Sequence, residues 1–242
     1  MIKIEKTDIF GWESAIRGMR NPLNSWSKSD SHRDGCRYTP LCYKSKDYAI
    51  GSNDLNLMQR LANAGSDHAK FLRMINVTCD IVAPLYWWKE YDTYKVGTVA
   101  NSCSTMHKIH EKEFALEDFS CEHLLQSSST QLELYSALTC APTNNGKSQW
   151  TPMMHLLSTI AGLNHYREKY LETKDKTYWW QMIQLLPSSY NQKRTVQLNY
   201  QVLLNMYHSR KNHKLDEWHT FCDWIERLPY FKEICLSNNK ED

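Results

Sequence analysis

Residues 57–90 read LMQRLANAGSDHAKFLRMINVTCDIVAPLYWWKE, and the spacing of their apolar residues changes halfway along. The first part belongs to a helix that Asn53 or Asp54 can cap and that Gly65 ends, because its apolar residues recur every three or four positions. Over 72–82 apolar and polar residues alternate and β-branched residues are frequent, which indicates a half-buried strand. The segment therefore predicts a fold that combines helices with a sheet.

The segments on either side follow the same two patterns. A short strand is expected within 1–10 and an amphipathic helix within 12–19. Pro84 should interrupt the central strand, with a helix or a second strand beginning at 85–89. The small polar residues of 95–106 indicate a loop that packs close to a ligand or another group. Further helices are predicted at 117–140, 152–170, 177–186, 194–210 and 214–227.

The domain organisation predicted from the sequence is simple. No internal repeat, low-complexity segment or shift in composition divides the chain, so we predict one domain over 1–242. Its class is α+β, with helices packed around a modest central β-sheet, because only 8 Gly and 7 Pro argue for long regular elements. Residues 21–52 should form a long polar loop, of a length that is usually functional or disordered. Residues 228–242 should form a C-terminal tail.

The bulk composition argues against several classes of partner. A net charge of +2 gives no electrostatic reason to expect nucleic-acid binding. No run of residues approaches the roughly 18 apolar residues of a membrane-spanning helix, and the N-terminal MIKIEKTDIF has no signal core. The eight cysteines form no CxxC pair and no zinc-like spacing with histidine. We therefore expect a cytoplasmic protein with reduced thiols, no metal, and neither a nucleic-acid nor a membrane partner.

Residues 141–148, APTNNGKS, fit a loose phosphate-loop pattern, but their context argues against such a loop. A phosphate loop follows a buried strand and leads directly into a helix. Here the apolar residues of 127–140 have a helical spacing, and Pro152 is typical of the first turn of a helix that starts later. The stretch predicts an exposed turn between two helices.

Three separated stretches resemble, in order, one protein family, the flavin-dependent thymidylate synthases. The first is 57–90, where the family has a helix ending in glycine, a strand, and then an I-x-A-P motif with an Arg-Gln pair. Ala83 and Pro84 stand in place. Lys89 and Glu90 fall where the Arg-Gln pair is expected.

The second stretch lies where the family carries the signature R-H-R-x7-S. Tyr94, Lys95 and Val96 fall at the three basic positions, and Ser104 follows after seven residues. Asn101 and Ser104 retain two marked positions of the family's longer motif. The basic character of the signature is reduced to one lysine.

The third stretch, 179–218, resembles the family's R-x-L-P motif, its N-L-R helix and its closing region. Two family arginines are replaced there, by Gln184 near the Leu-Pro pair and by Gln201 in the helix. The residues that fit are Leu186-Pro187 and Leu198-Asn199.

This resemblance covers roughly residues 50–220 and implies a homotetramer whose active sites are built from several subunits. It implies FAD as the cofactor, NADPH and methylenetetrahydrofolate as donors, and methylation of deoxyuridylate or a related pyrimidine nucleotide. Catalytic residues are not assigned. By the matches above, the nucleotide-binding residues would be Lys89, Glu90, Ser104, Gln184 and Gln201. The cofactor-binding residues would be Tyr94, Lys95, Asn101, Asn199 and His68.

The arginines that would bind an anionic nucleotide are missing at the matching positions. Arginine suits that task because its planar fork binds a phosphate with two hydrogen bonds. Glu90 adds a negative charge that repels a nearby phosphate, although it can accept a hydrogen bond from the amino group of a base. The uncharged replacements are Val96, Met106, Gln184 and Gln201. Cations that could compensate in part are Lys89, Lys95, Lys108, Arg194 and Arg210.

Two functions therefore remain open. The first is an active but divergent flavoenzyme. The second is a catalytically degenerate protein that binds a nucleotide without turnover, and so sequesters it or regulates a partner. A small divergent copy of a nucleotide enzyme is the sort of gene that a phage carries.

Several of these residues also have a structural interpretation. Ser104 can contact a phosphate or stabilise a turn, and Asn101 can cap a following helix. The aromatic residues suit stacking on a base or an isoalloxazine ring, or they belong to the core and the subunit interface. They are Trp87, Trp88, Tyr91, Tyr94, Trp179 and Trp180.

Overall fold

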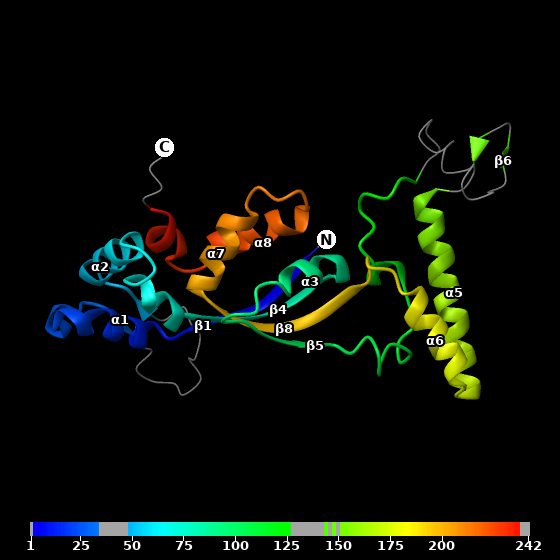
Figure 1. Cartoon of the computed structure of the whole chain (residues 1–242), viewed down its shortest axis with the longest axis horizontal. Coiled ribbons are helices and arrows are strands. Elements are labelled where there is room, and N and C mark those ends of the chain that lie inside the picture. The colour runs from blue at the N-terminus through cyan, green and yellow to red at the C-terminus, as the bar shows by residue number, and fades with distance from the viewer. Residues whose placement is uncertain (1, 34–47, 127–142, 145–146, 149–150, 238–242) are drawn as a thin grey trace. The chain divides into compact units, whose positions relative to one another are not determined.

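The computed structural model describes residues 2–33, 48–126, 143–144, 147–148 and 151–237 (Figure 1). The chain divides into two compact units, and each is described by itself. The sheet unit comprises Ile2–Val82, Lys89–Ser102 and the chain from Lys193 onward. The helical-pair unit comprises Ala83–Trp88 and Cys103–Gln192.

A four-stranded sheet, in the order β1-β4-β8-β5, forms the centre of the sheet unit. β1 (Lys3–Phe10) runs antiparallel to β4 (Asn76–Pro84). β5 (Val99–Ser102) runs antiparallel to β8 (Asn191–Asn199). The strand predicted from residues 72–82 is therefore confirmed, although it begins later than expected.

The later start of β4 has a packing cause. Residues Ala69–Met74 form a 3₁₀ helix that contacts α1 (Trp12–Arg20), α2 (Ser52–Asn63) and α7 (Tyr200–Arg210). Contact with three helices buries consecutive apolar residues in this segment, whereas a strand buries every second residue. Alternating burial begins only at Ile75.

Helix α2 and the helices of the C-terminal part of the chain complete the sheet unit. The predicted helix after residue 53 is α2, but its N-cap is Gly51, which makes no side-chain capping bond, and Asp54 is fully buried. α8 (Asp216–Glu226) packs on α7, as the helical spacing of 214–227 predicts. Part of the predicted C-terminal tail is folded, because a π-helical turn at Lys232–Leu236 packs on α2.

The predicted long loop at 21–52 contains short regular elements in its described parts. Two 3₁₀ turns occupy Asn21–Leu23 and Trp26–Lys28. β2 (His32–Arg33) then pairs with β3 (Tyr48–Ala49) in a two-stranded ribbon. Residues 34–47 lie outside the described part of the chain.

Two long helices dominate the helical-pair unit. α5 (Pro152–Thr173) begins with Pro152 in its first turn, as predicted, and Thr151 caps it by accepting a hydrogen bond from the amide of Met154. α6 (Lys176–Leu185) follows after two residues and packs on α5. Their shared core is formed by residues of the two helices together with three residues of the preceding segment, Ile109, Phe114 and Phe119. The helix residues are Leu156, Ile160, Leu163 and Met182.

Three secondary-structure predictions need correction. The helix predicted at 194–210 is a strand, β8, up to Asn199 and a helix only after it. The loop predicted at 95–106 contains β5. Residues 117–126 of the predicted helix 117–140 hold only the end of a 3₁₀ turn, Leu116–Asp118, and the remainder is outside the described residues. In the phosphate-loop stretch, Thr143–Asn144 (β6) pairs with Lys147–Ser148 (β7), so Lys147 starts no helix, which agrees with the argument against a phosphate loop.

The residue after β4 resolves an alternative that the sequence left open. α3 (Leu85–Tyr91) starts directly after Pro84, so this segment is a helix and not a second strand. Its first two amides donate to the backbone oxygens of Tyr190 and Ser188, at 3.0 Å each.

Candidate functional site

The structure distributes the ten predicted binding residues over both units. Ser104 and Gln184 belong to the helical-pair unit. The sheet unit carries His68, Lys89, Glu90, Tyr94, Lys95, Asn101, Asn199 and Gln201.

Glu90, at the end of α3, is held by two basic side chains of the sheet unit. Its Oε2 lies 2.6 Å from Nη1 of Arg210 and 3.1 Å from Nε2 of His213. Nε of Arg210 also donates to the hydroxyl of Tyr94 at 2.9 Å. The arginine offsets the negative charge of Glu90, so the expected repulsion between Glu90 and a bound phosphate is reduced.

Arg210 is also enclosed by aromatic rings. Its guanidinium carbon lies 4.9 Å from the ring centre of Trp218 and 5.5 Å from that of Tyr94. Trp218 is fully buried, and cation–π attraction is strongest where water is excluded. Arg210 and Tyr94 are therefore engaged in the packing of the sheet unit, in addition to any role toward a ligand.

The remaining predicted cations differ in their availability. Nη1 of Arg194 lies 2.7 Å from Oδ1 of Asp92, and Lys108 forms an ion pair with the carboxylate three residues further on. Lys89 and Lys95 are exposed, and no carboxylate within the described ranges lies at ion-pair distance from either. Of the predicted cations in the sheet unit, these two lysines are the most available to an anion.

Asn199 and Gln201 lie at the start of α7. The side-chain oxygen of Asn199 accepts a hydrogen bond from the amide of Val202 at 3.0 Å, which is the geometry of an N-cap. Nε2 of Gln201 donates to Oδ1 of Asn205 at 3.2 Å. The Oε1 atom of Gln201 is buried without a hydrogen-bond partner among the described residues. Helix capping accounts for Asn199, while Gln201 retains an unused acceptor.

Asn101 and His68 are both exposed. Asn101 lies in β5 opposite Thr195, so the helix that it was expected to cap is absent at this position. His68 directly precedes the 3₁₀ helix Ala69–Met74.

In the helical-pair unit, Ser104 stabilises a turn. Its hydroxyl oxygen accepts hydrogen bonds from the amide of Met106 at 3.2 Å and from the next amide at 2.8 Å. The loop is fixed further by Gln192, which donates to the carbonyl of Cys103 at 2.7 Å, and by Trp179, whose indole donates to the carbonyl of Met106 at 3.0 Å. The hydroxyl hydrogen of Ser104 remains able to donate to a ligand.

The aromatic residues divide between core and surface. Trp87 and Trp88 are 0% and 1% exposed, which favours the core interpretation for this pair. Trp180 is 43% exposed, and Nζ of Lys176 lies 5.7 Å from its ring centre. Gln184 is also exposed and follows Trp180 by four residues, so both side chains share one face of α6.

Asp80 is a charged residue that the sequence analysis missed. Its Oδ1 accepts a hydrogen bond from Thr195 at 2.7 Å, and its Oδ2 lies 2.9 Å from Nζ of Lys193 and 3.5 Å from Nζ of Lys6. The hydrogen bonds from Thr195 and Lys193 lower the pKa of Asp80 to about 2. An aspartate inside an otherwise apolar strand was the signal available in the sequence.

Two other features are absent from the described ranges, a metal-binding cluster and a membrane-spanning helix. No group of three or more His, Cys, Asp or Glu side chains there could hold a metal ion. In the same ranges, no helix has the length and apolar character needed to cross a membrane.

Comparison with known proteins gives a clear result at the level of the fold. No family model and no curated protein matches the sequence. The structure of ThyX from Helicobacter pylori with FAD and dUMP matches with a TM-score of 0.60 at 14% identity, over 97% of each chain. The UMP/dUMP methylase PolB from Streptomyces cacaoi, bound with 5-Br UMP, matches with a TM-score of 0.58 at 11% identity, over 98% of this chain and 94% of that one. The chain therefore has the fold of the flavin-dependent thymidylate synthases, as the three sequence stretches predict.

Proposed function

We propose that this protein binds a pyrimidine nucleotide through residues 87–108 and 179–210, at the subunit interfaces of a homotetramer. The observation that carries the proposal is the fold, which matches almost the whole length of two proteins whose structures hold uracil nucleotides. A fold alone does not determine chemistry, so the choice between turnover and binding depends on the side chains.

The side chains favour binding without turnover over thymidylate synthesis. Arg210 and Arg194 are each held by a carboxylate, and glutamines stand where the family has two of its arginines. Lys89 and Lys95 supply positive charge, but a lysine is a point charge and lacks the two-pronged geometry of arginine. A phosphate is then attracted with less control over its orientation, and catalysis depends on orientation more steeply than binding does.

FAD is a proposed second ligand, and the helical-pair unit offers groups that suit it. The exposed Trp180 presents an aromatic ring, and Lys176 lies over that ring. When bound, FAD would supply hydride transfer. The residues of this chain would bind and orient it.

An absorbance spectrum of the purified protein, followed by mass spectrometry of what heat releases, tests the cofactor. In the mass spectrum we expect an unaltered pyrimidine nucleotide among the released molecules. If FAD is retained, the absorbance spectrum should show a flavin band at roughly 450 nm. Release of no nucleotide, together with no binding of added dUMP, UMP or FAD in calorimetry, would contradict the proposal.

Two further experiments separate the alternatives and test the site. A well-expressed protein that rescues a thymidine auxotroph would show that the synthase interpretation is correct and the binder interpretation wrong. For the site, Lys95→Gln should weaken dUMP binding by about tenfold, because a charge-assisted contact to phosphate is lost. Lys211→Gln, the same change at an exposed position outside the proposed segments, is the matched control.

A further inference from the structure

The two outer strands of the four-stranded sheet differ in the charge that they carry. The order β1-β4-β8-β5 leaves β1 and β5 with one neighbour each. β1 reads KIEKTDIF and includes four charged residues, whereas β5 reads VANS and includes none. Proteins commonly protect an outer strand with charges, prolines or bulges, because its unpaired backbone groups can bind another strand. The charge pattern therefore indicates that β1 is protected and that β5 is open to pairing.

The backbone of β1 carries a second form of protection. Its pairing with β4 shifts register between Glu5 and Asp8, and Lys6 within that bulge has a φ of 52°, in the left-handed region. A bulge twists an outer strand and interrupts its regular row of backbone groups. Lys3 and Glu5 also form an ion pair of 2.6 Å on this strand. These features oppose the pairing of a further strand along β1.

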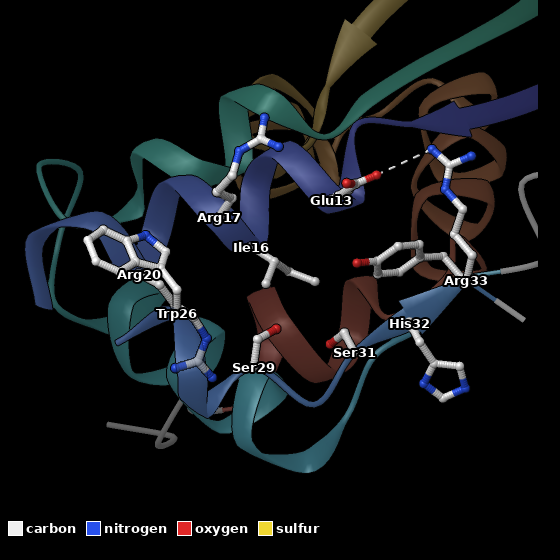
Figure 2. A pocket seen from close by; sticks show the side chains of 10 residues that line it. Glu13, Ile16, Arg17, Arg20, Trp26, Ser29, Ser31, His32 and Arg33 are labelled. Carbon is white, nitrogen blue, oxygen red and sulfur yellow. Dashed lines mark hydrogen bonds and ion pairs between the residues drawn. The ribbon is translucent and has the colours of Figure 1, made fainter. Parts of the chain in front are cut away.

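The two-stranded ribbon of β2 and β3 also carries charge. The dashed line in Figure 2 marks an ion pair between Arg33 of β2 and Glu13 of α1, and Nη2 of Arg33 lies 3.5 Å from Oε2 of Glu13. His32, the other residue of β2, is exposed. Charged side chains thus accompany β1 and β2, and the lack of charge distinguishes β5 from both.

β5 is regular and exposed. It pairs with β8 from Val99 opposite Gln197 to Ser102 opposite Arg194, without a shift of register. All four of its residues are exposed, and within the described part of the chain β8 is the only strand that pairs with them. In Figure 1, β5 lies on the side of β8 away from β4. Since antiparallel neighbours bond through alternate residues, the backbone groups of the other residues of β5 point away from β8.

Apolar side chains adjoin this open edge. Val96 is 91% exposed and Val99 is 66% exposed, and no other large apolar residue of the described chain is as exposed as these two. A strand that paired with β5 would cover part of this surface and remove it from water. The most exposed apolar side chains therefore lie at or next to the uncharged outer strand.

A second copy of the same chain fits this edge by charge. From Val96 to Met106 the sequence has no Lys, Arg, Asp or Glu, so two copies of β5 meet without like charges between them. Lys95 is the nearest charged residue before the strand. Parallel pairing would place the two copies of Lys95 side by side, whereas antiparallel pairing about a two-fold axis places them at opposite ends. A two-fold contact also makes each favourable interaction twice. The strand is therefore complementary to itself in the antiparallel direction.

We propose that β5 pairs antiparallel with β5 of a second copy of this chain, about a two-fold axis perpendicular to the sheet. The two four-stranded sheets then join into one continuous sheet, and Val99 lies near its own copy across the axis. The proposal rests on the proposed homotetramer and assigns one of its interfaces to this strand. Lys95 precedes β5 by four residues, so the pairing brings a partner chain beside a segment that we propose to bind the nucleotide.

Charge reversal across the axis tests the pairing directly. Val99→Lys and Val99→Glu are prepared separately and also coexpressed, and each sample is studied by sedimentation velocity at low ionic strength, where charges are least screened. Each variant alone places two like charges near the axis, so we expect species of about half the wild-type mass. The coexpressed pair places opposite charges there, so we expect the wild-type mass to return. A contact of this strand with any other surface does not predict that recovery.

Gln197→Lys and Gln197→Glu are the matched controls, because Gln197 is exposed and lies opposite Val99 on the inner strand β8. Both controls should keep the wild-type mass. Wild-type mass in both Val99 variants would overturn the proposal, as would a lack of recovery on coexpression or an equal effect of the Gln197 variants. Circular dichroism confirms that each variant is folded.

Hydrogen exchange of the wild type gives a second readout that needs no substitution. Pairing on both sides should slow the exchange of every amide of β5, whereas an open edge leaves alternate amides fast. Fast alternate amides in the assembled protein would overturn the proposal.

Calorimetry with dUMP on the same wild-type sample separates this proposal from the proposed function. Nucleotide binding by a tetramer whose mass the Val99 variants do not change would overturn the edge pairing and leave the proposed function standing. A wild-type dimer that Val99→Lys converts to a monomer would support the edge pairing and contradict the homotetramer. A monomeric wild type would overturn both assemblies, and its binding of dUMP would then be judged by itself.

Discussion

Asp80 shows how a single carboxylate can make the sheet sensitive to acid. Its pKa is lowered to about 2, first by the hydrogen bond from Thr195 and then by Lys193. An unfolded aspartate titrates near about 3.9, so the folded state binds its proton later than the unfolded state does. The stabilisation from Asp80 is therefore complete above about pH 4 and is lost as the pH falls toward 2.

We expect Asp80→Asn to remove this part of the acid dependence. The free energy of unfolding of the variant, measured in urea at several pH values, should fall less steeply between about pH 4 and 2 than that of the wild type. Asp67→Asn, which changes an exposed carboxylate, should keep the wild-type slope. An unchanged slope in Asp80→Asn would show that the three partner side chains do not act on this carboxylate in solution.

The buried ion pair between Arg20 and Asp54 leads to a prediction of a large loss of stability when one partner is removed. Burial raises the pKa of Asp54, but hydrogen bonds from Ser31, Ser29 and Arg20 outweigh it and the pKa is lowered. Asp54→Ala leaves the guanidinium of Arg20 buried without its partner, which typically costs about 3–5 kcal/mol. Thermal unfolding should detect this loss. Arg60→Ala on the surface of α2 should change stability by less than about 0.5 kcal/mol, and an equally small change in Asp54→Ala would contradict the structure.

At the scale of elements, substitutions of Asn199 can distinguish a structural role of this residue from a role in binding. If it serves as the N-cap of α7, Asn199→Ala should lower the free energy of unfolding by about 1 kcal/mol. Asn199→Asp keeps an acceptor for the amide of Val202 and should retain most of the stability. Chemical denaturation of both variants, with FAD binding measured alongside, gives the answer. Loss of FAD binding in both variants, at wild-type stability, would instead support the cofactor role predicted from the sequence.

The contact between the ends of α3 and α7 can be measured as a coupling energy. Glu90→Gln and Arg210→Met each remove one partner of the ion pair, and the double variant removes both. Because the guanidinium also packs on Trp218, we expect a coupling of about 1 kcal/mol in a double-mutant cycle. Strictly additive effects would indicate that the pair is broken in solution.

Much of the secondary structure could be predicted because local patterns and packing agree. β1, α1, α5, α6 and α8 all lie where apolar spacing or a proline places them. β8 was missed because its sequence NQKRTVQLN has few apolar residues and runs directly into the helical pattern of α7. β5 was missed for a related reason, since all four of its residues are exposed and it exists through pairing with β8.

The candidate site was less predictable, because its contacts join residues far apart in the chain. Glu90 and Arg210 are 120 residues apart, and no local periodicity relates them. His213 and Trp218, which complete that cluster, carry no motif. The resemblance selected segments that contain Glu90 and Arg210, while the pairing of their charges required the structure.

At the scale of the whole molecule, the proposed homotetramer can be tested on the edge strand. Val96 and Val99 are 91% and 66% exposed in a single chain, so a partner subunit that covered them would remove apolar surface from water. Sedimentation velocity of the wild type should give four times the chain mass. Val99→Lys should give smaller species with unchanged circular dichroism. A wild-type protein that sediments as a monomer would contradict the proposed assembly.

The order of the strands also has a consequence for how the protein is made. β4 ends at Pro84 and its neighbour β8 begins at Asn191, so roughly a hundred residues must be synthesised between them. At 5–20 residues per second, the growing chain waits on the order of ten seconds before β4 gains its second neighbour. During that interval β1 protects one edge of a strongly apolar strand, and the other edge is open to pairing with foreign chains. We therefore expect the yield of folded protein in a cell to depend on chaperones that cover this edge during translation, and slower translation to prolong the exposure.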